Sequence, residues 1–182
     1  HDIAPGTQQR AMLSAGYTGL DFGAGELGRF DISQVPFNFR YEFSHTLATF
    51  ARMNTGFDLQ WGTNTVQIRT PEFNGQRIAA DINTPSFNPA WYAELELTPV
   101  RGLRIVPSLR VDWYRAISNT QIQPRMSFRY EFLRDWAVKG GVGVFGQPPQ
   151  PQESTSAANA FLPGQTLGNP NLRPIRSIHY SL

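Results

Sequence analysis

Cysteine is absent from the 182-residue sequence, which excludes disulfide scaffolds, thiolate metal sites and cysteine nucleophiles. Long apolar runs are absent too: no stretch of about 18 apolar residues occurs, so a membrane-spanning helix is excluded. Neither charge is in clear excess, because 16 Lys and Arg against 14 Asp and Glu give a net charge of +2. The basic residues stand singly, and we expect no nucleic-acid partner.

The residues that are plentiful favour strands. Gly occurs 16 times, Pro 14 times and Phe 13 times, a composition that interrupts helices and supplies turns and β-formers. The mean hydropathy is −0.35. This value is compatible with a membrane-spanning barrel, because a barrel strand needs only about 9–11 residues and turns every second side chain to a polar lumen. The composition predicts an all-β protein.

Strict alternation marks the clearest strand. From Val35 to Ser44 every odd position is apolar or aromatic, and the even positions from 38 onward are polar. A period of two predicts a strand. Pro36 lacks an N–H for the ladder, so we expect it at the first turn or the edge of this strand.

The next segment allows two interpretations. In the first, one long strand runs from about residue 47 to residue 69 after a tight turn at Ser44 and His45. In the second, two strands are separated at residues 62–64, which read Gly-Thr-Asn.

Four further alternating segments follow, joined by short and longer connections in turn. Short turns are predicted after Thr98 and after Phe132, and longer polar connections are predicted at residues 71–90, 115–120 and 146–176. Outer-membrane barrels have short periplasmic turns and long external loops, so we expect the two turns in the periplasm and the three loops outside. The segments are residues 91–98, 103–113, 122–132 and 136–145.

The alternation assigns the side chains to two faces. One face would line a wet lumen, and its charged residues are Arg104, Arg110, Asp112, Arg125, Arg129, Glu131 and Lys139. Aromatic rings gather at strand ends, where they settle at membrane interfaces; these are Trp91, Trp113, Tyr114, Phe132 and Trp136. A sheet with charged residues on one face and none on the opposite face is expected for the wall of a membrane barrel more than for a soluble β-sandwich.

Symmetric hairpins would give four cross-strand pairs on the charged face. Opposed charges across strands contribute about 0.2–1 kcal/mol each, and glycine opposite arginine leaves room for a long side chain. The expected pairs are Arg104 with Glu131, Arg110 with Arg125, Arg125 with Gly143, and Ser127 with Gly141.

No constellation of residues indicates catalysis or a metal. Gly23 to Gly28 fits the pattern G-x-G-x-x-G, but the residues after it alternate with period two instead of opening a helix, so we expect a glycine-rich loop. His1, His45 and His179 lack the spacing of metal ligands. We therefore expect no enzyme, no metal and no cofactor.

Three stretches resemble the β-barrel of TonB-dependent outer-membrane receptors. The clearest is Leu167 to Ser177, which reads Leu-Gly-Asn-Pro-Asn-Leu-Arg-Pro-Ile-Arg-Ser and leads into His179 and Tyr180. It is similar to the family's segment before a late strand, with Ile175 where the family usually carries Glu. The others are Leu103 to Tyr114 with Gln123 to Arg125, an arginine-bearing strand followed by a Pro-Arg strand, and Lys139 to Pro149, a strand that runs into a Phe-, Gln- and Pro-rich loop.

The resemblance implies an antiparallel up-and-down transmembrane β-barrel of 22 strands, of which about seven or eight are present here. It implies uptake of a small-molecule or metal-chelate ligand across the bacterial outer membrane, with a TonB-type energy-coupling protein acting through parts outside this chain. The charged lumen residues would form wall hydrogen bonds, a polar path or a contact with a plug. The loop from Gln147 to Asn171 is the expected place of ligand specificity.

Two other functions stay open at this point: a small self-contained outer-membrane barrel with an adhesive or structural role, and a soluble β-sandwich binding domain. Residues 1–34 are expected to be a loop or poorly defined strand region. Residues 35–182 are expected to be part of one antiparallel β-barrel domain truncated at both ends, since the alternating segment from Ser177 stops at Leu182.

Overall fold

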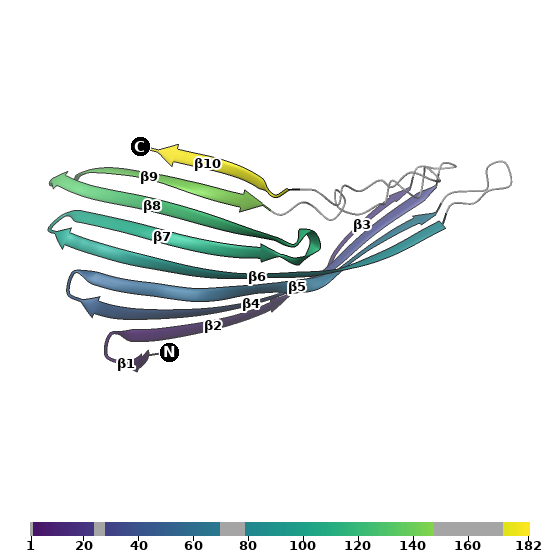
Figure 1. Cartoon of the computed structure of the whole chain (residues 1–182), viewed down its shortest axis with the longest axis horizontal. Helices are drawn as coiled ribbons and strands as arrows, with labels where there is room; N and C mark the ends of the chain where they lie inside the picture. The colour runs from purple at the N-terminus through teal and green to yellow at the C-terminus, as the bar shows by residue number, and fades with distance from the viewer. Residues whose placement is uncertain (1, 24–27, 70–78, 148–172) are drawn as a thin grey trace.

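A computed structural model describes residues 2–23, 28–69, 79–147 and 173–182. These residues form one antiparallel ten-stranded sheet, which is curved and does not close into a barrel (Figure 1). The strand order is β1-β2-β4-β5-β6-β7-β8-β9-β10, and β3 also pairs with β4. The elements are β1 Asp2–Ala4, β2 Thr7–Ala15, β3 Thr18–Gly23, β4 Arg29–Ala48, β5 Ala51–Arg69, β6 Ala79–Val100, β7 Leu103–Tyr114, the 3-10 turn η2 Arg115–Ile117, β8 Asn119–Leu133, β9 Trp136–Gln147 and β10 Ile175–Ser181.

Strands β2 and β3 are two parts of one line along β4. Ala15 pairs with Phe37 and Thr18 pairs with Gln34, so the register is unchanged across the gap between them. Pro36 lies opposite this gap and has no N–H to donate, although its carbonyl still accepts a hydrogen bond from Gly16 N at 3.0 Å. Pro36 therefore interrupts the ladder in the middle of β4, and the expectation that it would begin the strand is wrong because β4 already starts at Arg29.

The first part of the chain was expected to be a loop or poorly defined strand region. Its described residues, 2–23 and 28–34, form β1, β2, β3 and the start of β4. Their own alternation is weak, because Thr7 to Arg10 are polar at every position. The pairing comes from the strongly patterned partner strand β4.

Two-residue turns connect the hairpins at one end of the sheet. They occupy residues 5–6, 49–50, 101–102 and 134–135, and three of them contain a residue with positive φ: Gly6, Gly102 and Asp135. The turns predicted after Thr98 and Phe132 are confirmed. The turn predicted at Ser44 and His45 is wrong, since β4 continues to Ala48, but the single long strand proposed for the next segment is confirmed by β5.

The strand ends that the longer connections join lie at the opposite end of the sheet, and one of these connections is shorter than expected. Residues 79–90, assigned to a loop, belong to β6. Their prolines, Pro85 and Pro89, suggested a loop, but the register of β6 with β7 begins only at Ala90. Along this stretch, among the described residues, β6 pairs only with β5. A proline there can point its missing N–H away from β5, and no hydrogen bond of the ladder is lost.

The sheet has two chemically distinct faces. Residues that pair across strands point to the same face, and neighbours in sequence point to opposite faces. We call the surface that carries Arg40, Asp58, Arg110 and Arg125 the polar face. The apolar face carries Phe39, Leu59, Leu109 and Met126, among others. No helix in the described part of the chain is long and apolar enough to cross a membrane.

Candidate functional site: the polar face

Asp58 on β5 joins two arginines from different strands. Its Oδ1 accepts a hydrogen bond from Arg40 Nε on β4 at 2.5 Å, and its Oδ2 accepts one from Arg110 Nη1 on β7 at 2.5 Å. Strand β6 lies between β5 and β7, and the residue of β6 opposite Asp58 is Ala90. Because Ala90 is small, the Arg110 side chain can reach across β6 to the carboxylate.

The network continues from Arg110 towards the far strands. Arg110 Nη2 donates to Asp112 Oδ1 at 2.9 Å, and Gln123 Nε2 on β8 donates to Asp112 Oδ2 at 2.6 Å. Arg125 Nη2 donates to Gln123 Oε1 at 2.7 Å. Gln123 is only 3% exposed, so its amide is a fixed bridge between an acidic and a basic side chain.

An aromatic pair extends this network to the last strand. The guanidinium carbon of Arg125 lies 4.3 Å from the centre of the Phe145 ring on β9, a cation–π contact. Phe145 in turn meets the His179 ring on β10 edge to face, with centroids 5.1 Å apart. A continuous series of polar and aromatic contacts therefore crosses the sheet from β4 to β10.

A second charged group lies nearer the short turns. Arg104, Arg129 and Lys139 are in direct register across β7, β8 and β9. Like charges directly opposite one another are unfavourable, and two nearby acids offset them. Glu96 Oε1 is 2.8 Å from Arg104 Nε, and Glu131 Oε1 is 2.8 Å from Arg129 Nη2.

The seven charged residues assigned to the lumen all fall on the polar face. Two of the four expected pairs are wrong: Arg104 pairs with Arg129, and Arg110 pairs with Gln123. The pairs of Arg125 with Gly143 and Ser127 with Gly141 are confirmed. The turn after β7 explains the difference, because η2 and Ser118 in the left-handed region shift the hairpin by two residues. A shift of two leaves every side chain on its face.

Sequence reasoning missed Arg40 and Asp58, which the structure brings into the same network as Arg110. The signal was available in part, because both are charged even-numbered residues in alternating segments. Their contact with β7 was not predictable, since it requires a reach across an intervening strand.

Four of the five aromatic residues assigned to membrane interfaces are exposed on the apolar face. These are Trp91, Trp113, Phe132 and Trp136. The assignment of Tyr114 is wrong. As the neighbour of Trp113 it points to the polar face, where it is 4% exposed.

Four rings of the apolar face form a row across β4, β5, β6 and β7, at the level where β7 ends. Phe37 stacks on Trp61 with centroids 5.6 Å apart, Trp61 pairs with Phe87, and Phe87 meets Trp113 at 6.2 Å. We call these four residues the aromatic row. Other rings of the same face, including Tyr130 and Phe132 with centroids 6.4 Å apart, lie near the short turns.

Beyond the aromatic row, β4, β5 and β6 continue and β3 lies beside β4 (Figure 1). In this part of the sheet the two faces exchange character. On the face that was apolar, Asp31, Gln67 and Asp81 lie side by side in register. On the face that was polar, Val66 and Ile68 are buried and pack against Phe30 and Ile32. The apolar face is therefore confined to the part of the sheet between the aromatic row and the short turns.

The described residues contain no group of three or more His, Asp or Glu side chains that could hold a metal ion. Two sequence motifs lie wholly or partly outside the described residues. They are the glycine-rich Gly23 to Gly28 and the segment from Leu167 to Ser177, and most of the connection at 146–176 lies there too.

One antiparallel up-and-down sheet, polar on one face and apolar on the other between rows of aromatic rings, defines the wall of a transmembrane β-barrel. The sequence matches the family described as "TonB dependent receptor-like, beta-barrel" over residues 4–182. The chain belongs to this family, whose members are outer-membrane receptors that transport ligands. The resemblance and the fold class predicted from the sequence are thereby confirmed.

One similar solved structure is the crystal structure of the siderophore receptor PirA from Pseudomonas aeruginosa. The two chains are 15% identical, with a TM-score of 0.45, and the alignment covers 98% of this chain and 46% of that chain. The present chain thus spans about half the length of that receptor. The comparison with curated proteins found no match.

Proposed function

We propose that the chain is part of the barrel wall of a receptor that takes up a small-molecule or metal-chelate ligand through the bacterial outer membrane. The apolar face contacts lipid, and the polar face lines the lumen. The short turns lie in the periplasm and the longer connections lie outside. A TonB-type protein supplies energy through parts of the receptor outside this chain. The proposal includes no catalytic step.

The exchange of faces at the aromatic row is the observation that carries the proposal. Between this row and the short turns, large apolar side chains such as Leu109, Ile122 and Val142 are exposed, which is costly in water and natural in lipid. Strand β7 covers this zone with 12 residues, close to the 9–11 or so that cross a bilayer. Beyond the row the outward side chains include Asp31, Gln67 and Asp81, which suit an aqueous surrounding.

Neither of the alternatives gains support from the described residues. A β-sandwich needs a second sheet to cover the apolar side chains, and the described strands form one sheet. A small self-contained barrel needs its first and last strands to pair, and the strand path from β1 to β10 does not close in the part of the chain that the structure describes.

A pair of adjacent cysteine variants tests which face meets lipid. The chain has no cysteine, so Leu109→Cys and Ser108→Cys each introduce a single thiol, on opposite faces of the same strand. Each is placed in the complete receptor, labelled with a pyrene maleimide and reconstituted in liposomes of brominated phospholipid. We expect strong quenching for Leu109→Cys and little for Ser108→Cys. Equal quenching of both would contradict the proposed orientation.

Uptake is tested in cells that carry the complete receptor. Fractionation should find the receptor in the outer membrane as a heat-modifiable band. Accumulation of the ligand should require both the receptor and the TonB-type protein. Recovery of the receptor in a soluble fraction would refute the assignment of this chain to a membrane wall.

A further inference from the structure

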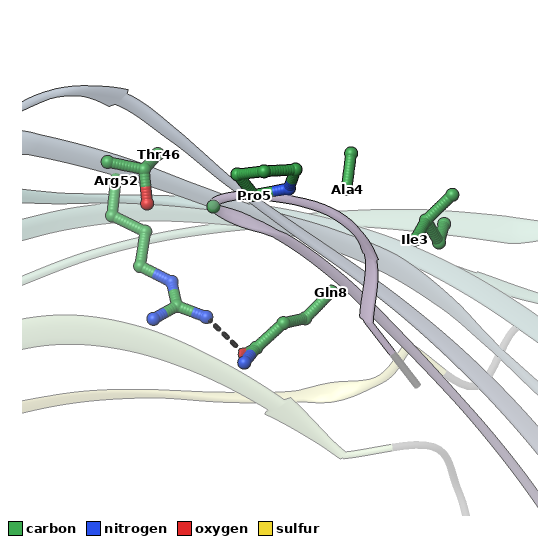
Figure 2. Close-up of a pocket in the computed structure, with 7 residues that line it drawn as sticks. Ile3, Ala4, Pro5, Gln8, Thr46 and Arg52 are labelled. Carbon is green, nitrogen blue, oxygen red and sulfur yellow. Dashed lines mark hydrogen bonds between the residues drawn. The ribbon is translucent and has the colours of Figure 1, made fainter.

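A hollow of about 410 Å³ opens beside the first hairpin of the sheet. Figure 2 shows its lining, which combines the β1–β2 turn with side chains from β2, β4 and β5. The turn residues Pro5 and Gly6 lie beside Thr46, whose backbone N–H donates to Gly6 O at 2.9 Å. The full lining is Ile3, Ala4, Pro5, Gly6, Gln8, Thr46 and Arg52.

Arg52 is the single charged side chain of this lining. Its Nη2 donates to Gln8 Oε1 at 2.7 Å, the contact drawn in Figure 2. Its Nε is buried and has no hydrogen-bond partner. A guanidinium has five N–H donors, and the described residues engage only one guanidinium nitrogen of Arg52.

The acid best placed to pair with Arg52 is already engaged. Glu96 on β6 lies directly opposite Arg52 in the ladder, but its carboxylate pairs with Arg104 Nε at 2.8 Å. Among the described residues Arg52 forms no ion pair, and no acidic residue lines the hollow. Among the side chains that the structure describes, the lining is thus positively charged, with a guanidinium, an amide and a hydroxyl beside the small apolar surface of Ile3 and Ala4.

We propose that this hollow binds a carboxylate group presented at the short-turn end of the polar face. A guanidinium fork matches the two oxygens of a carboxylate, and charge-assisted hydrogen bonds of this kind are about twice as strong as neutral ones. Gln8 and Thr46 can add neutral donors. The proposal rests on the proposed function only in assigning this end of the polar face to the periplasmic half of the lumen.

A single thiol at the edge of the hollow reports on the site. Thr46→Cys, which lines the hollow directly opposite Arg52 on the same face, gives the complete receptor the only cysteine of this chain. This thiol is modified with an anionic or a cationic methanethiosulfonate reagent. Arg52 should favour the anionic reagent by about threefold relative to Arg52→Gln, as expected for one neighbouring charge in a solvated site. The matched control is Arg101→Gln, an exposed arginine at another short turn, and it should leave the rate ratio unchanged.

Occupancy is then tested by protection of this thiol. Acetate should slow the anionic reagent, whereas chloride at equal ionic strength should not. The blocked peptide acetyl-Gly-Asp-Gly-amide should protect, and its Asn analogue should not. Protection by the Asp peptide at about a tenfold lower concentration than acetate would identify a polypeptide as the source of the carboxylate, and equal concentrations would identify a free carboxylate.

The remaining outcomes are also decisive. A thiol that is unreactive until Arg52→Gln is introduced would mean that a carboxylate of the receptor itself already fills the hollow, which supports the proposal. Arg52→Lys should keep the charge preference and lose most of the protection, because the fork is gone. Protection no better than with chloride and the Asn peptide, or unchanged in Arg52→Gln, would overturn the inference. Heat-modifiable migration and ligand uptake in the same preparations would leave the proposed function standing.

Discussion

Replacing Arg110 with Gln removes the cation that joins Asp58 on β5 to Asp112 on β7. The Arg110 side chain is 25% exposed, and the two carboxylates are 17% and 11% exposed, so all three groups are largely withdrawn from water. Removing one partner of a buried ion pair costs about 3–5 kcal/mol, because an uncompensated charge stays behind. Here Asp58 keeps Arg40 and Asp112 keeps Gln123, and we expect a loss of about 2–3 kcal/mol.

The assay is equilibrium unfolding of the complete receptor in urea, followed by tryptophan emission and by loss of the heat-modifiable band. Arg129→Gln is the matched control on the same face. Its partner is Glu131, and the two side chains are 57% and 55% exposed, so its loss should cost less than about 1 kcal/mol. If Arg110→Gln were no more destabilising than Arg129→Gln, the network around Asp58 would not stabilise the wall as argued here.

Two further predictions use pairs of variants. Ala90→Leu should destabilise the receptor by about 1–3 kcal/mol in the same urea assay, because the new side chain obstructs the reach of Arg110 across β6, whereas Ala93→Leu on the apolar face should change little. Leu109→Arg should lower the yield of folded receptor in the outer membrane and destabilise it by about 2–4 kcal/mol, the effect of a cation at the bilayer midplane. Ser108→Arg, on the polar face, should assemble normally. Equal yields for Leu109→Arg and Ser108→Arg would contradict the assignment of faces.

The sequence contained enough to predict the class of fold and the membership of each face. Alternation in Val35 to Ser44 and in the segments after Trp91 is a local property. The face assigned to each residue therefore stays correct even where the predicted register of two strands is wrong by two residues. The pairing of Arg104 illustrates this: the partner was expected to be Glu131 and is Arg129, yet both lie on the polar face because they are two residues apart.

What the sequence did not reveal depends on neighbours. Thr7 to Arg10 form part of a strand because β4 pairs with them, not because of their own pattern. Pro85 and Pro89 are tolerated in β6 because the pairing of β6 with β7 ends at Ala90, before it reaches either proline. Arg110 reaches Asp58 because the small residue Ala90 stands between them on β6. No local sequence motif links these three residues, so only the three-dimensional arrangement shows their contact.

The exchange of faces at the aromatic row has a consequence for how this chain can change in length. Between the row and the short turns, one inserted or deleted residue within a strand would turn every following side chain to the wrong face, exposing charges such as Asp58 to lipid and rings such as Trp61 to the lumen. An indel of two residues keeps every side chain on its face. Variation in length should therefore accumulate in steps of two inside the strands and freely in the connections beyond the aromatic row.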